Sequence, residues 1–345
     1  MRVSSVGLGR RSFNTMFASA AATSGMLALP RIARAATPAT LRMDWALSGY
    51  QLPFYWAKKK GYYDEAGIDL TIKDGAGSAK SAQLVASGED TFGLVDATVT
   101  VNSIAKGMQI KSIMMVVQEG GSAIVSWAAK PIKAPADMVG HSLATTADQK
   151  PLIELLCTVN KVPVDQVQMR IVSMQARNTV FYQHQVDGFV SVVIGSPMDM
   201  IVAAKEGRGD PIYLMPFSDF GIRTMATGAV ARDDTIAQKP ELVRAFTHAS
   251  CKAMAEIADE KLADEATDVA MALSGAPANR RESVKLQWLA TLPRLRTQYS
   301  KDKPLGWTSA EDWNACIDLL LKTEQISAAI PADSVYTNAF ITNGV

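Results

Sequence analysis

Short apolar segments alternate with amphipathic segments from residue 39 onward, and this alternation limits the fold more than any other feature of the sequence. In the first block, apolar runs with a period of two or without interruption predict strands at 41–45, 68–72, 91–95 and 110–117. Runs with helical spacing, each ending at a glycine, predict helices at 54–60, 78–87 and 99–106. Strands that alternate with helices in this way are typical of βαβ units, so the block is predicted to form a mostly parallel sheet.

A second block repeats the alternation. It predicts strands at 142–145, 167–173, 188–194 and 211–215, and helices at 150–160, 178–185 and 197–205. After the segment 224–231 the remainder is nearly all helical, with helices predicted at 240–259, 260–273, 279–292 and 308–323. Two lobes joined by crossing strands would produce this order, and so would a single doubly wound sheet. Periodicity alone does not choose between them.

Residues 1–35 have the order of an export signal. Arg10 and Arg11 precede an uncharged segment at 16–29, and Ala33-Arg34-Ala35 supplies small residues around a cleavage site. The paired arginines, with Phe13 two places on, resemble a twin-arginine export signal. A transmembrane anchor fits less well, because the segment contains Ser, Thr and Gly and falls short of the ~20 apolar residues that a span needs. We therefore expect cleavage near Ala35 and a periplasmic mature protein.

The charge of the chain argues against two kinds of partner. Residues 1–35 contain five arginines and no acid, so removing them turns a formal charge of +1 into a mildly acidic one. A mildly acidic surface disfavours nucleic acid and anionic membrane as partners. The cysteines are Cys157, Cys251 and Cys316, an odd number, and each lies in an apolar helical context. Buried free thiols are the favoured interpretation, one disulfide remains open, and their spacing does not suggest a metal site.

A glycine-rich turn at 75–81 is the first candidate binding element. It lacks the Gly-Lys spacing of a P-loop. Gly77 and Ser78 nevertheless lead into a predicted helix, whose free N–H groups can bind a polar ligand group. An ordinary turn between a strand and a helix explains the same residues.

Aromatic residues are concentrated between positions 45 and 63. Trp45 and Tyr50 flank a predicted loop at the carboxyl end of a strand, where open α/β sheets place ligands, and Gln51 follows directly. An aromatic side chain there can stack on a flat ring. Core packing accounts for most of the other aromatics in this stretch.

Two acidic residues complete the candidate site. Asp96 follows a predicted strand and precedes a helix, so it serves either as a helix N-cap or as a hydrogen-bond acceptor for a ligand. Asp219, followed by Phe220, has the same ambiguity in the second block. No catalytic arrangement emerges, because the three histidines are far apart and no nucleophile or zinc motif occurs. We expect a binding protein without a cofactor or metal, not an enzyme.

Several segments in order resemble one known family. They are Asp44-Trp45, 54–57, 61–70, 88–93, 106–111, 132–140, 306–313 and 335–340. These segments resemble the exported solute-binding proteins of the sulfonate, nitrate and thiamine-pyrimidine type, which are related to enzymes that make the thiamine pyrimidine in fungi. The similarity spans nearly the whole mature chain, and the last two segments resemble the pyrimidine branch in particular.

The resemblance implies a two-lobed periplasmic-binding-protein-like α/β fold of the type with two crossover strands, with doubly wound lobes and a helical C-terminal segment. Residues 36–128 and 228–345 would form lobe 1, residues 129–227 would form lobe 2, and a small molecule would bind between them. It also implies a cognate ABC permease and ATPase, and we expect a monomer.

Two departures bear on the ligand and on the enzyme alternative. The pyrimidine branch commonly carries His-Ala-Gly where this chain has Gln51-Leu52-Pro53. The fungal synthases carry a cysteine-rich motif and a histidine that is consumed, and this chain has neither near Gln51. Trp45, Tyr50 and the acidic residues favour a pyrimidine-like or related nitrogen heterocycle. The alternatives are a receptor for a sulfonate- or nitrate-type anion and a pyrimidine-precursor-synthesising enzyme.

Overall fold

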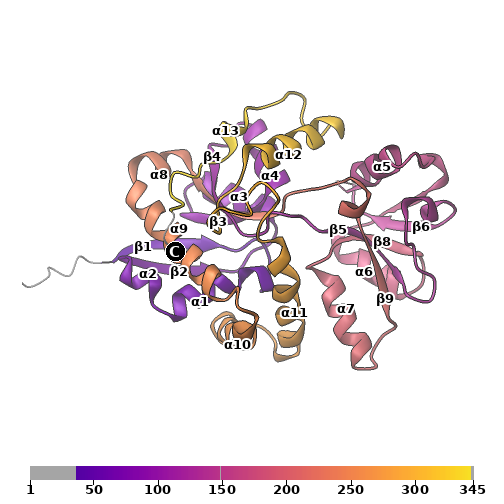
Figure 1. Cartoon of the computed structure of the whole chain (residues 1–345), viewed down its shortest axis with the longest axis horizontal. Helices are drawn as coiled ribbons and strands as arrows, with labels where there is room; N and C mark the ends of the chain where they lie inside the picture. The colour runs from indigo at the N-terminus through magenta and orange to yellow at the C-terminus, as the bar shows by residue number, and fades with distance from the viewer. Residues whose placement is uncertain (1–35, 148, 343–345) are drawn as a thin grey trace, which may run out of the picture. The chain divides into compact units, whose positions relative to one another are not determined.

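A computed structural model describes residues 36–147 and 149–342, and its strands form two five-stranded sheets (Figure 1). The first sheet has the order β2-β1-β3-β10-β4, with strands Ile68–Lys73, Thr37–Arg42, Phe92–Asp96, Thr227–Arg232 and Ile110–Met115. The second has the order β7-β6-β8-β5-β9, with strands Gln168–Ile171, Ser142–Thr145, Gly188–Val192, Ser122–Trp127 and Ile212–Pro216. The two-lobed α/β prediction is thereby confirmed over the single-sheet alternative.

Each sheet contains one strand that runs against its neighbours. In the first sheet β1 pairs in parallel with β2 and β3, while β10 lies antiparallel between β3 and β4. In the second sheet β6 pairs in parallel with β7 and β8, while β5 lies antiparallel between β8 and β9. The carboxyl ends of β1 and β3 therefore meet at one edge of the first sheet, and those of β6 and β8 at one edge of the second.

The chain crosses from the first sheet to the second after β4 and returns before β10. The two crossing segments touch, through a bridge between Gly120 and Thr224 and an ion pair of 3.6 Å between Glu119 and Arg223. Strand β5, residues 122–127, lies in the second sheet because the chain has already crossed at that point. The boundary between the lobes that is expected from the sequence instead falls after residue 128. The residue ranges of the two lobes stay a prediction.

The helices surround the sheets. Their bounds are α1 Leu52–Lys59, α2 Tyr62–Glu65, α3 Ser78–Ala86, α4 Ala97–Ala105, α5 Lys150–Val159, α6 Met174–Tyr182, α7 Ser196–Lys205, α8 Asp233–Gln238, α9 Pro240–Glu256, α10 Ala263–Ser274, α11 Arg281–Thr291, α12 Ala310–Lys322 and α13 Ala332–Val335. The alternation and the helical C-terminal segment agree with the sequence prediction. The expected strand at 41–45 was misplaced, because β1 starts at Thr37 and its pairing with β2 ends at Arg42.

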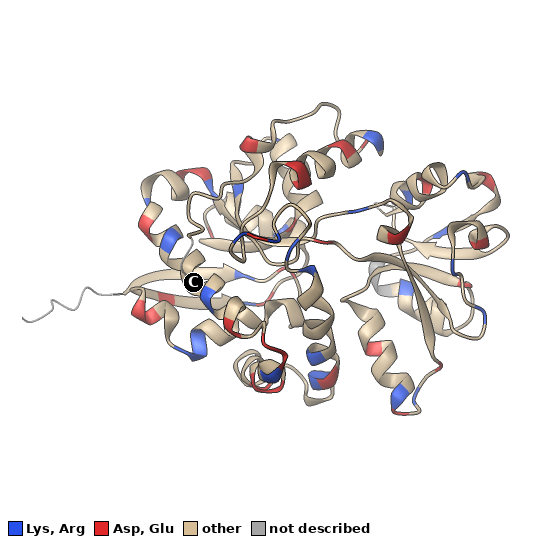
Figure 2. Ribbon diagram, viewed as in Figure 1, with Lys and Arg blue, Asp and Glu red and all other residues tan. Residues whose placement is uncertain are grey.

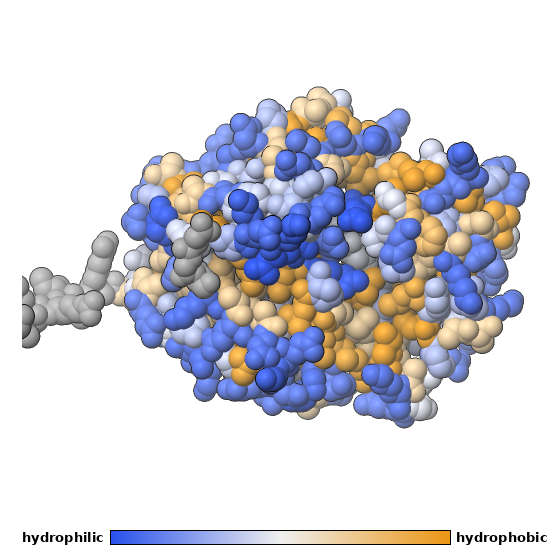
Figure 3. All heavy atoms as spheres, viewed as in Figure 1, coloured by the Kyte–Doolittle hydropathy of each residue, from blue (hydrophilic) through white to orange (hydrophobic). Residues whose placement is uncertain are grey.

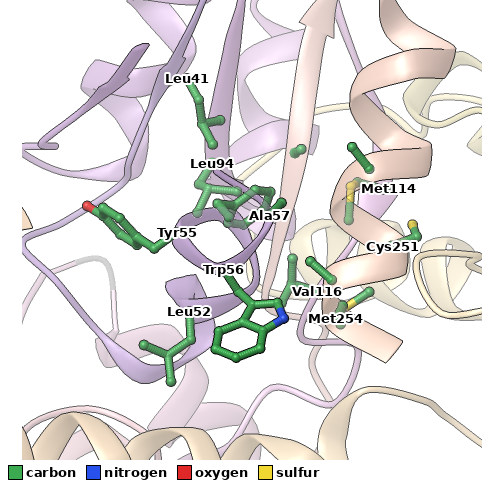
Figure 4. Packing of buried hydrophobic residues seen from close by; sticks show 14 of the residues in the cluster. Leu41, Leu52, Tyr55, Trp56, Ala57, Leu94, Met114, Val116, Cys251 and Met254 are labelled. Carbon is green, nitrogen blue, oxygen red and sulfur yellow. The ribbon is translucent and has the colours of Figure 1, made fainter. Parts of the chain in front are cut away.

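The core of the first sheet is built around α1 and α9. Phe246 of α9 stacks on Phe92 of β3 with ring centroids 4.0 Å apart. Tyr55 and Trp56 leave α1 in different directions, and both are buried (Figure 4). Most aromatics between positions 45 and 63 are thus core residues, as expected. A carboxylate at the strand ends adds a polar clamp, since Asp90 accepts hydrogen bonds from Arg42 and Lys73 at 2.8 and 2.7 Å.

One further sequence expectation, on the cysteines, is confirmed in the described residues. Cys157, Cys251 and Cys316 are all buried free thiols. Basic and acidic residues are interspersed over the ribbon in the view of Figure 2. Of the helices in the described ranges, none has both the length and the apolar character needed to cross a membrane. The proposed export signal at residues 1–35 lies outside the described residues.

Candidate functional site

A buried carboxylate, Asp44, lies just beyond the carboxyl end of β1. Its side chain accepts a hydrogen bond of 2.9 Å from the hydroxyl of Tyr50 and one of 3.1 Å from the amide of Gln51. Only 7% of the residue is exposed. Burial raises the pKa of Asp44, while the hydrogen bonds from Tyr50 and Gln51 oppose that rise. The site therefore contains an acidic group that a hydrogen-bond donor on a ligand would stabilise in its ionised form.

Tyr50 and Gln51 form a short 3₁₀ helix, η1 (Gly49–Gln51), that orients Asp44. The amide of Gln51 is wholly buried, and its oxygen accepts a hydrogen bond of 3.2 Å from the backbone N–H of Ser48. Its nitrogen donates to Asp44 and, at 3.4 Å, to the carbonyl of Trp45. Because both ends of the amide already have protein partners, the role of Gln51 that these contacts show is to orient Asp44.

Asp96 is the second carboxylate of the site. It caps α4, as the sequence suggested, by accepting a hydrogen bond of 2.8 Å from the backbone N–H of Thr98. Burial raises the pKa of Asp96 to about 6, against the hydrogen bonds from Thr98, and the charge of Asp44 adds to the rise. The charge of Asp44 thus raises the pKa of Asp96, and the two residues lie at the ends of the neighbouring strands β1 and β3.

The glycine-rich turn joins these two acids. The backbone N–H of Gly77 donates a hydrogen bond of 2.7 Å to the carbonyl of Asp44, and the hydroxyl of Ser78 accepts one of 3.1 Å from the N–H of Asp96. Gly77 has a φ of 111°, a backbone conformation that favours glycine. The structure therefore brings together Tyr50, Gln51, Gly77, Ser78 and Asp96 from the sequence prediction, with Asp44 as the residue they share. We call these six residues the Asp44 group.

The two predicted aromatics differ in how they are exposed. The phenol of Tyr50 is engaged with Asp44, and the residue packs against the core of the first sheet. Trp45, next to Asp44 in the chain, is 46% exposed. Trp45 therefore presents an accessible aromatic side chain directly after the buried acid Asp44 in the chain.

Asp219 and Phe220 lie in a different part of the molecule. They belong to a 3₁₀ helix, η4 (Phe217–Phe220), that follows β9 of the second sheet. Asp219 is exposed and accepts a hydrogen bond of 3.3 Å from Ser218. The carbonyl of Phe220 accepts one of 3.0 Å from Asn160 at the end of α5. These hydrogen bonds stay within the second sheet and its helices, and within the described ranges they do not join Asp219 or Phe220 to the Asp44 group.

A side chain that the sequence did not indicate connects the Asp44 group to the second sheet. The oxygen of Gln287, on α11, accepts a hydrogen bond of 2.9 Å from the N–H of Gly49, and its nitrogen donates one of 3.4 Å to the carbonyl of Gly195. Gly49 itself lies so close to α11 that an added Cβ would stand 2.1 Å from the backbone nitrogen of Trp288. The start of η1 is thereby fixed against α11.

Helices α7 and α11 also meet directly. Arg280 and Asp199 form an ion pair of 3.4 Å, and Met198 and Val193 belong to an apolar cluster with Leu286 and Ala290. Hydrophobic residues gather on the face shown in Figure 3 over the region where α7 and α11 lie in Figure 1. The contact between the two sheets therefore has an apolar part and a polar part, and Gln287 belongs to the polar part.

Two hollows elsewhere on the molecule are separate from this group. One of about 620 Å³ lies between α5 and the end of α12, and one of about 240 Å³ lies between α1, β2 and α10. Their lining residues include no member of the Asp44 group. Within the described ranges, no group of three or more His, Cys, Asp or Glu residues is arranged to hold a metal ion.

Comparison with solved structures defines the class of fold. The chain is similar to the periplasmic aliphatic sulphonate-binding protein SsuA of Escherichia coli, with a TM-score of 0.65 and 12% identity over 88% of this chain and 99% of that one. It is also similar to the periplasmic nitrate-binding protein NrtA of Synechocystis, with a TM-score of 0.64 and 12% identity over 88% of this chain and 87% of that one. The two sheets with crossing segments are thus a periplasmic-binding-protein fold.

The family follows from the sequence comparison. The family described as "NMT1/THI5 like" matches residues 48–261, and the chain belongs to it. The chain is 23% identical to the riboflavin-binding protein RibY of Chloroflexus aurantiacus over 88% of this chain and 86% of that protein. It is 20% identical to the formylaminopyrimidine-binding protein of Halalkalibacterium halodurans over 86% of this chain and 88% of that protein. These matches confirm the family resemblance seen in the sequence.

Proposed function

We propose that this chain is the periplasmic solute-binding receptor of an ABC importer, and that it binds a small pyrimidine-like or related nitrogen heterocycle between its two sheets. The observation that carries the proposal is that Asp44 and Asp96 lie at the ends of the neighbouring strands β1 and β3, with the exposed Trp45 next to Asp44 in the chain. A flat heterocycle with amino or ring N–H groups would stack on the indole and donate hydrogen bonds to the carboxylates. Gly77 and Ser78 hold the two acids in place from the turn between them.

The same acids disfavour a small anion as the ligand. Asp96 already has a pKa raised to about 6 by burial, with the charge of Asp44 adding to the effect. A sulfonate or nitrate ion at this position would meet further negative charge and would need several N–H or cationic donors. The two relatives named above are called riboflavin-binding and formylaminopyrimidine-binding, and both names refer to nitrogen heterocycles.

The proposal also covers the export of the chain to the periplasm and the delivery of its ligand to a transporter. The pattern around Arg10, Arg11 and Ala35 supports secretion through the twin-arginine machinery, with a mature N-terminus at Ala36. In the periplasm the receptor would act as a monomer and pass its ligand to a cognate permease and ATPase. Sequencing the N-terminus of periplasmic protein tests the cleavage site. Export that persists when Arg10 and Arg11 are both replaced by lysine would contradict the route.

Ligand identity can be tested with a thermal-shift panel. The panel contains aminopyrimidines, thiamine- and flavin-related compounds, taurine, alkyl sulfonates and nitrate, and a ligand at a hundred times its Kd should stabilise the protein by about 2.7 kcal/mol. Trp45→Ala and Asp96→Ala should abolish the shift given by a heterocycle. Tyr299→Ala and Asp302→Ala are matched controls, since both residues are exposed and lie outside the Asp44 group. Stabilisation by sulfonates or nitrate alone would contradict the proposal.

The same panel can be extended to test the proposed contacts from the second sheet and the alternative function. Asp219 and Phe220 stay proposed contacts from the second sheet, and Asp219→Ala and Phe220→Ala test them directly. The alternative function is a pyrimidine-precursor synthase, since the chain is 28% identical to a Saccharomyces cerevisiae 4-amino-5-hydroxymethyl-2-methylpyrimidine phosphate synthase over 80 residues, 23% of this chain. A receptor returns its ligand unchanged, so mass spectrometry of the bound compound after long incubation distinguishes the two.

A further inference from the structure

A second group of polar side chains lies at the carboxyl ends of β6 and β8 in the second sheet. Thr146 follows β6, Ser191 lies near the end of β8, and Ser196 begins α7. The other members are Gln149, Arg177 and Asn178. We call these six residues the Ser196 group. The carboxyl ends of strands are where open α/β sheets bind ligands, and the Asp44 group has the corresponding place on the first sheet.

The hydrogen bonds within the Ser196 group are long. The hydroxyls of Ser191 and Ser196 are 3.3 Å apart, Arg177 donates to Ser191 at 3.5 Å, and Ser196 donates to Asn178 at 3.5 Å. Strong hydrogen bonds between such groups are nearer 2.7–3.0 Å. These hydroxyls therefore keep the capacity to form a better hydrogen bond with another partner.

Thr146 is an independent indication of a missing partner. Only 6% of the residue is exposed, yet its hydroxyl has no hydrogen-bond partner among the residues that the structure describes. A buried hydroxyl without a partner costs about 1–3 kcal/mol, and such groups are rare in folded proteins. A ligand oxygen at this edge of the sheet would supply what the fold does not.

The two polar groups meet at one side chain. Gln287 hydrogen-bonds to Gly49, the residue before Tyr50, and to Gly195, the residue before Ser196. The contact between α7 and the start of α11 supports this arrangement, since Arg280 and Asp199 form an ion pair between them. The Asp44 group and the Ser196 group therefore border the same junction between the two sheets, one with acidic acceptors and the other with hydroxyl and guanidinium donors.

We propose that the Ser196 group is the second half of the ligand site and that it binds carbonyl or carboxylate oxygens of the ligand. This inference rests on the proposed function, in which Asp44 and Asp96 bind the N–H groups of the same molecule. The ligand is accordingly a nitrogen heterocycle with donors along one edge and an oxygen acceptor on the opposite side. A ring with amino groups alone satisfies only the first half of the site.

Isothermal titration calorimetry with two probe compounds tests the inference. The probes are 2-aminopyrimidine and 2-aminopyrimidine-5-carboxamide, in which the carboxamide lies opposite the amino group. Wild-type protein should bind the carboxamide more tightly. Ser196→Ala, Ser191→Ala and Thr146→Val should each weaken carboxamide binding about three- to tenfold, the effect of one neutral hydrogen bond, and leave 2-aminopyrimidine unchanged. Thr158→Val, at an exposed hydroxyl on α5 that bonds within its own helix, is the control and should change neither.

The outcomes separate this inference from the proposed function. Asp96→Asn should weaken both probes, because both carry the amino group. If both probes bind and lose affinity in Asp96→Asn, but the three hydroxyl variants bind the carboxamide as wild type does, the second half-site is wrong and the receptor function stands. If neither probe binds wild-type protein, aminopyrimidine recognition is wrong and the inference falls with it. Thermal unfolding of each variant shows whether a loss of binding reflects a loss of folding.

Discussion

The hydroxyl of Tyr50 donates a hydrogen bond of 2.9 Å to Oδ2 of Asp44, and the carboxylate that receives it is almost completely buried. This contact opposes the rise in the pKa of Asp44 that burial causes. It also keeps one oxygen of the carboxylate in a fixed direction. Tyr50 thus favours the ionised form of the acid that we propose as a ligand contact and fixes its orientation.

Tyr50→Phe should weaken ligand binding by roughly tenfold. The substitution removes one donor to an ionised group, an interaction of about 1.5–3 kcal/mol, and leaves the aromatic packing of the ring intact. The pKa of Asp44 should rise further, so of two pH values the loss should be larger at the lower one. Calorimetric titration at both pH values measures it, with Tyr299→Phe as the control for an exposed tyrosine. Equal affinity of Tyr50→Phe and wild type at both pH values would contradict the role assigned to Tyr50.

The affinity for an amino-heterocycle should depend on pH through Asp96. The ionised carboxylate accepts hydrogen bonds from the ligand, and the pKa of Asp96 is about 6, so affinity should fall towards tenfold per pH unit below that value. Asp96→Asn should remove the part of this dependence that Asp96 causes, and any slope that remains belongs to Asp44 or to titration of the ligand. A binding curve that is flat between pH 5 and 8 in wild-type protein would show that Asp96 does not contact the ligand.

The stability of the ligand-free protein should change in the opposite direction. An acid whose pKa is raised in the folded state favours folding fully below its unfolded value of 3.8, and this contribution is lost as the pH rises through about 6. Asn is also a good N-cap, so Asp96→Asn retains the cap of α4 without the cost of a buried charge. At pH 7.5 the variant should unfold with a free energy about 1–2 kcal/mol higher than wild type, after allowance for partial solvent screening. Urea titrations at pH 5 and 7.5 measure the difference, which should shrink at the lower pH.

The parts of the fold that local sequence encodes were predicted well. Strands β2, β3 and β4 and most helices carry their own periodicity and end at glycines such as Gly61 and Gly88, which have positive φ. Strand β5, residues 122–127, was missed because serines interrupt its apolar pattern. It becomes a strand through antiparallel pairing with β8 and β9, which lie far along the chain.

The residues of the candidate site also divide into those that the local sequence indicates and those that it does not. Gly77, Ser78 and Asp96 were found because each follows a strand or a turn in the sequence. Asp44 was overlooked as a site residue because the predicted strand ran to residue 45, whereas β1 ends at Arg42 and leaves Asp44 in the loop at its carboxyl end. Its position before Trp45 in the family-like segment was the available signal. Gln287 had no local signal, since its partners Gly49 and Gly195 lie far away in sequence.

Asp90 should be among the most sensitive polar positions of the first sheet. Its buried carboxylate accepts hydrogen bonds from Lys73 and Arg42, and although burial opposes the effect, these bonds lower the pKa of Asp90. Asp90→Asn leaves two cations without their partner and should cost about 3 kcal/mol of unfolding free energy. Asp268→Asn is the matched control, because its bonds to Arg281 are exposed and should contribute at most about 1 kcal/mol.

The sign of the pH dependence checks the Asp90 assignment separately. An acid with a lowered pKa in the folded state stabilises the protein above its unfolded value of 3.8, and that contribution is lost as the pH falls through the folded pKa. The stability gap between wild type and Asp90→Asn should therefore be largest at neutral pH and shrink below pH 4. Chemical unfolding at pH 7 and 3.5 gives the two values, and a gap that grew towards acid pH would contradict the clamp.

Gln287→Ala should separate the Asp44 group from the second sheet. The variant leaves the buried N–H of Gly49 without an acceptor and removes the bond to Gly195, which should cost about 1–3 kcal/mol of unfolding free energy. Because η1 carries Tyr50 and Gln51, ligand affinity should fall even though Gln287 belongs to neither polar group.

Gln287→Glu retains the acceptor for Gly49 but loses the donor for Gly195. It should therefore keep η1 fixed while altering how the two sheets are held, seen as a change in small-angle scattering of the ligand-free protein. Gln298→Ala, on the loop before α12, is the control. If Gln287→Ala binds ligand as tightly as wild type and scatters identically, the glutamine is a local packing residue and does not couple the two sheets.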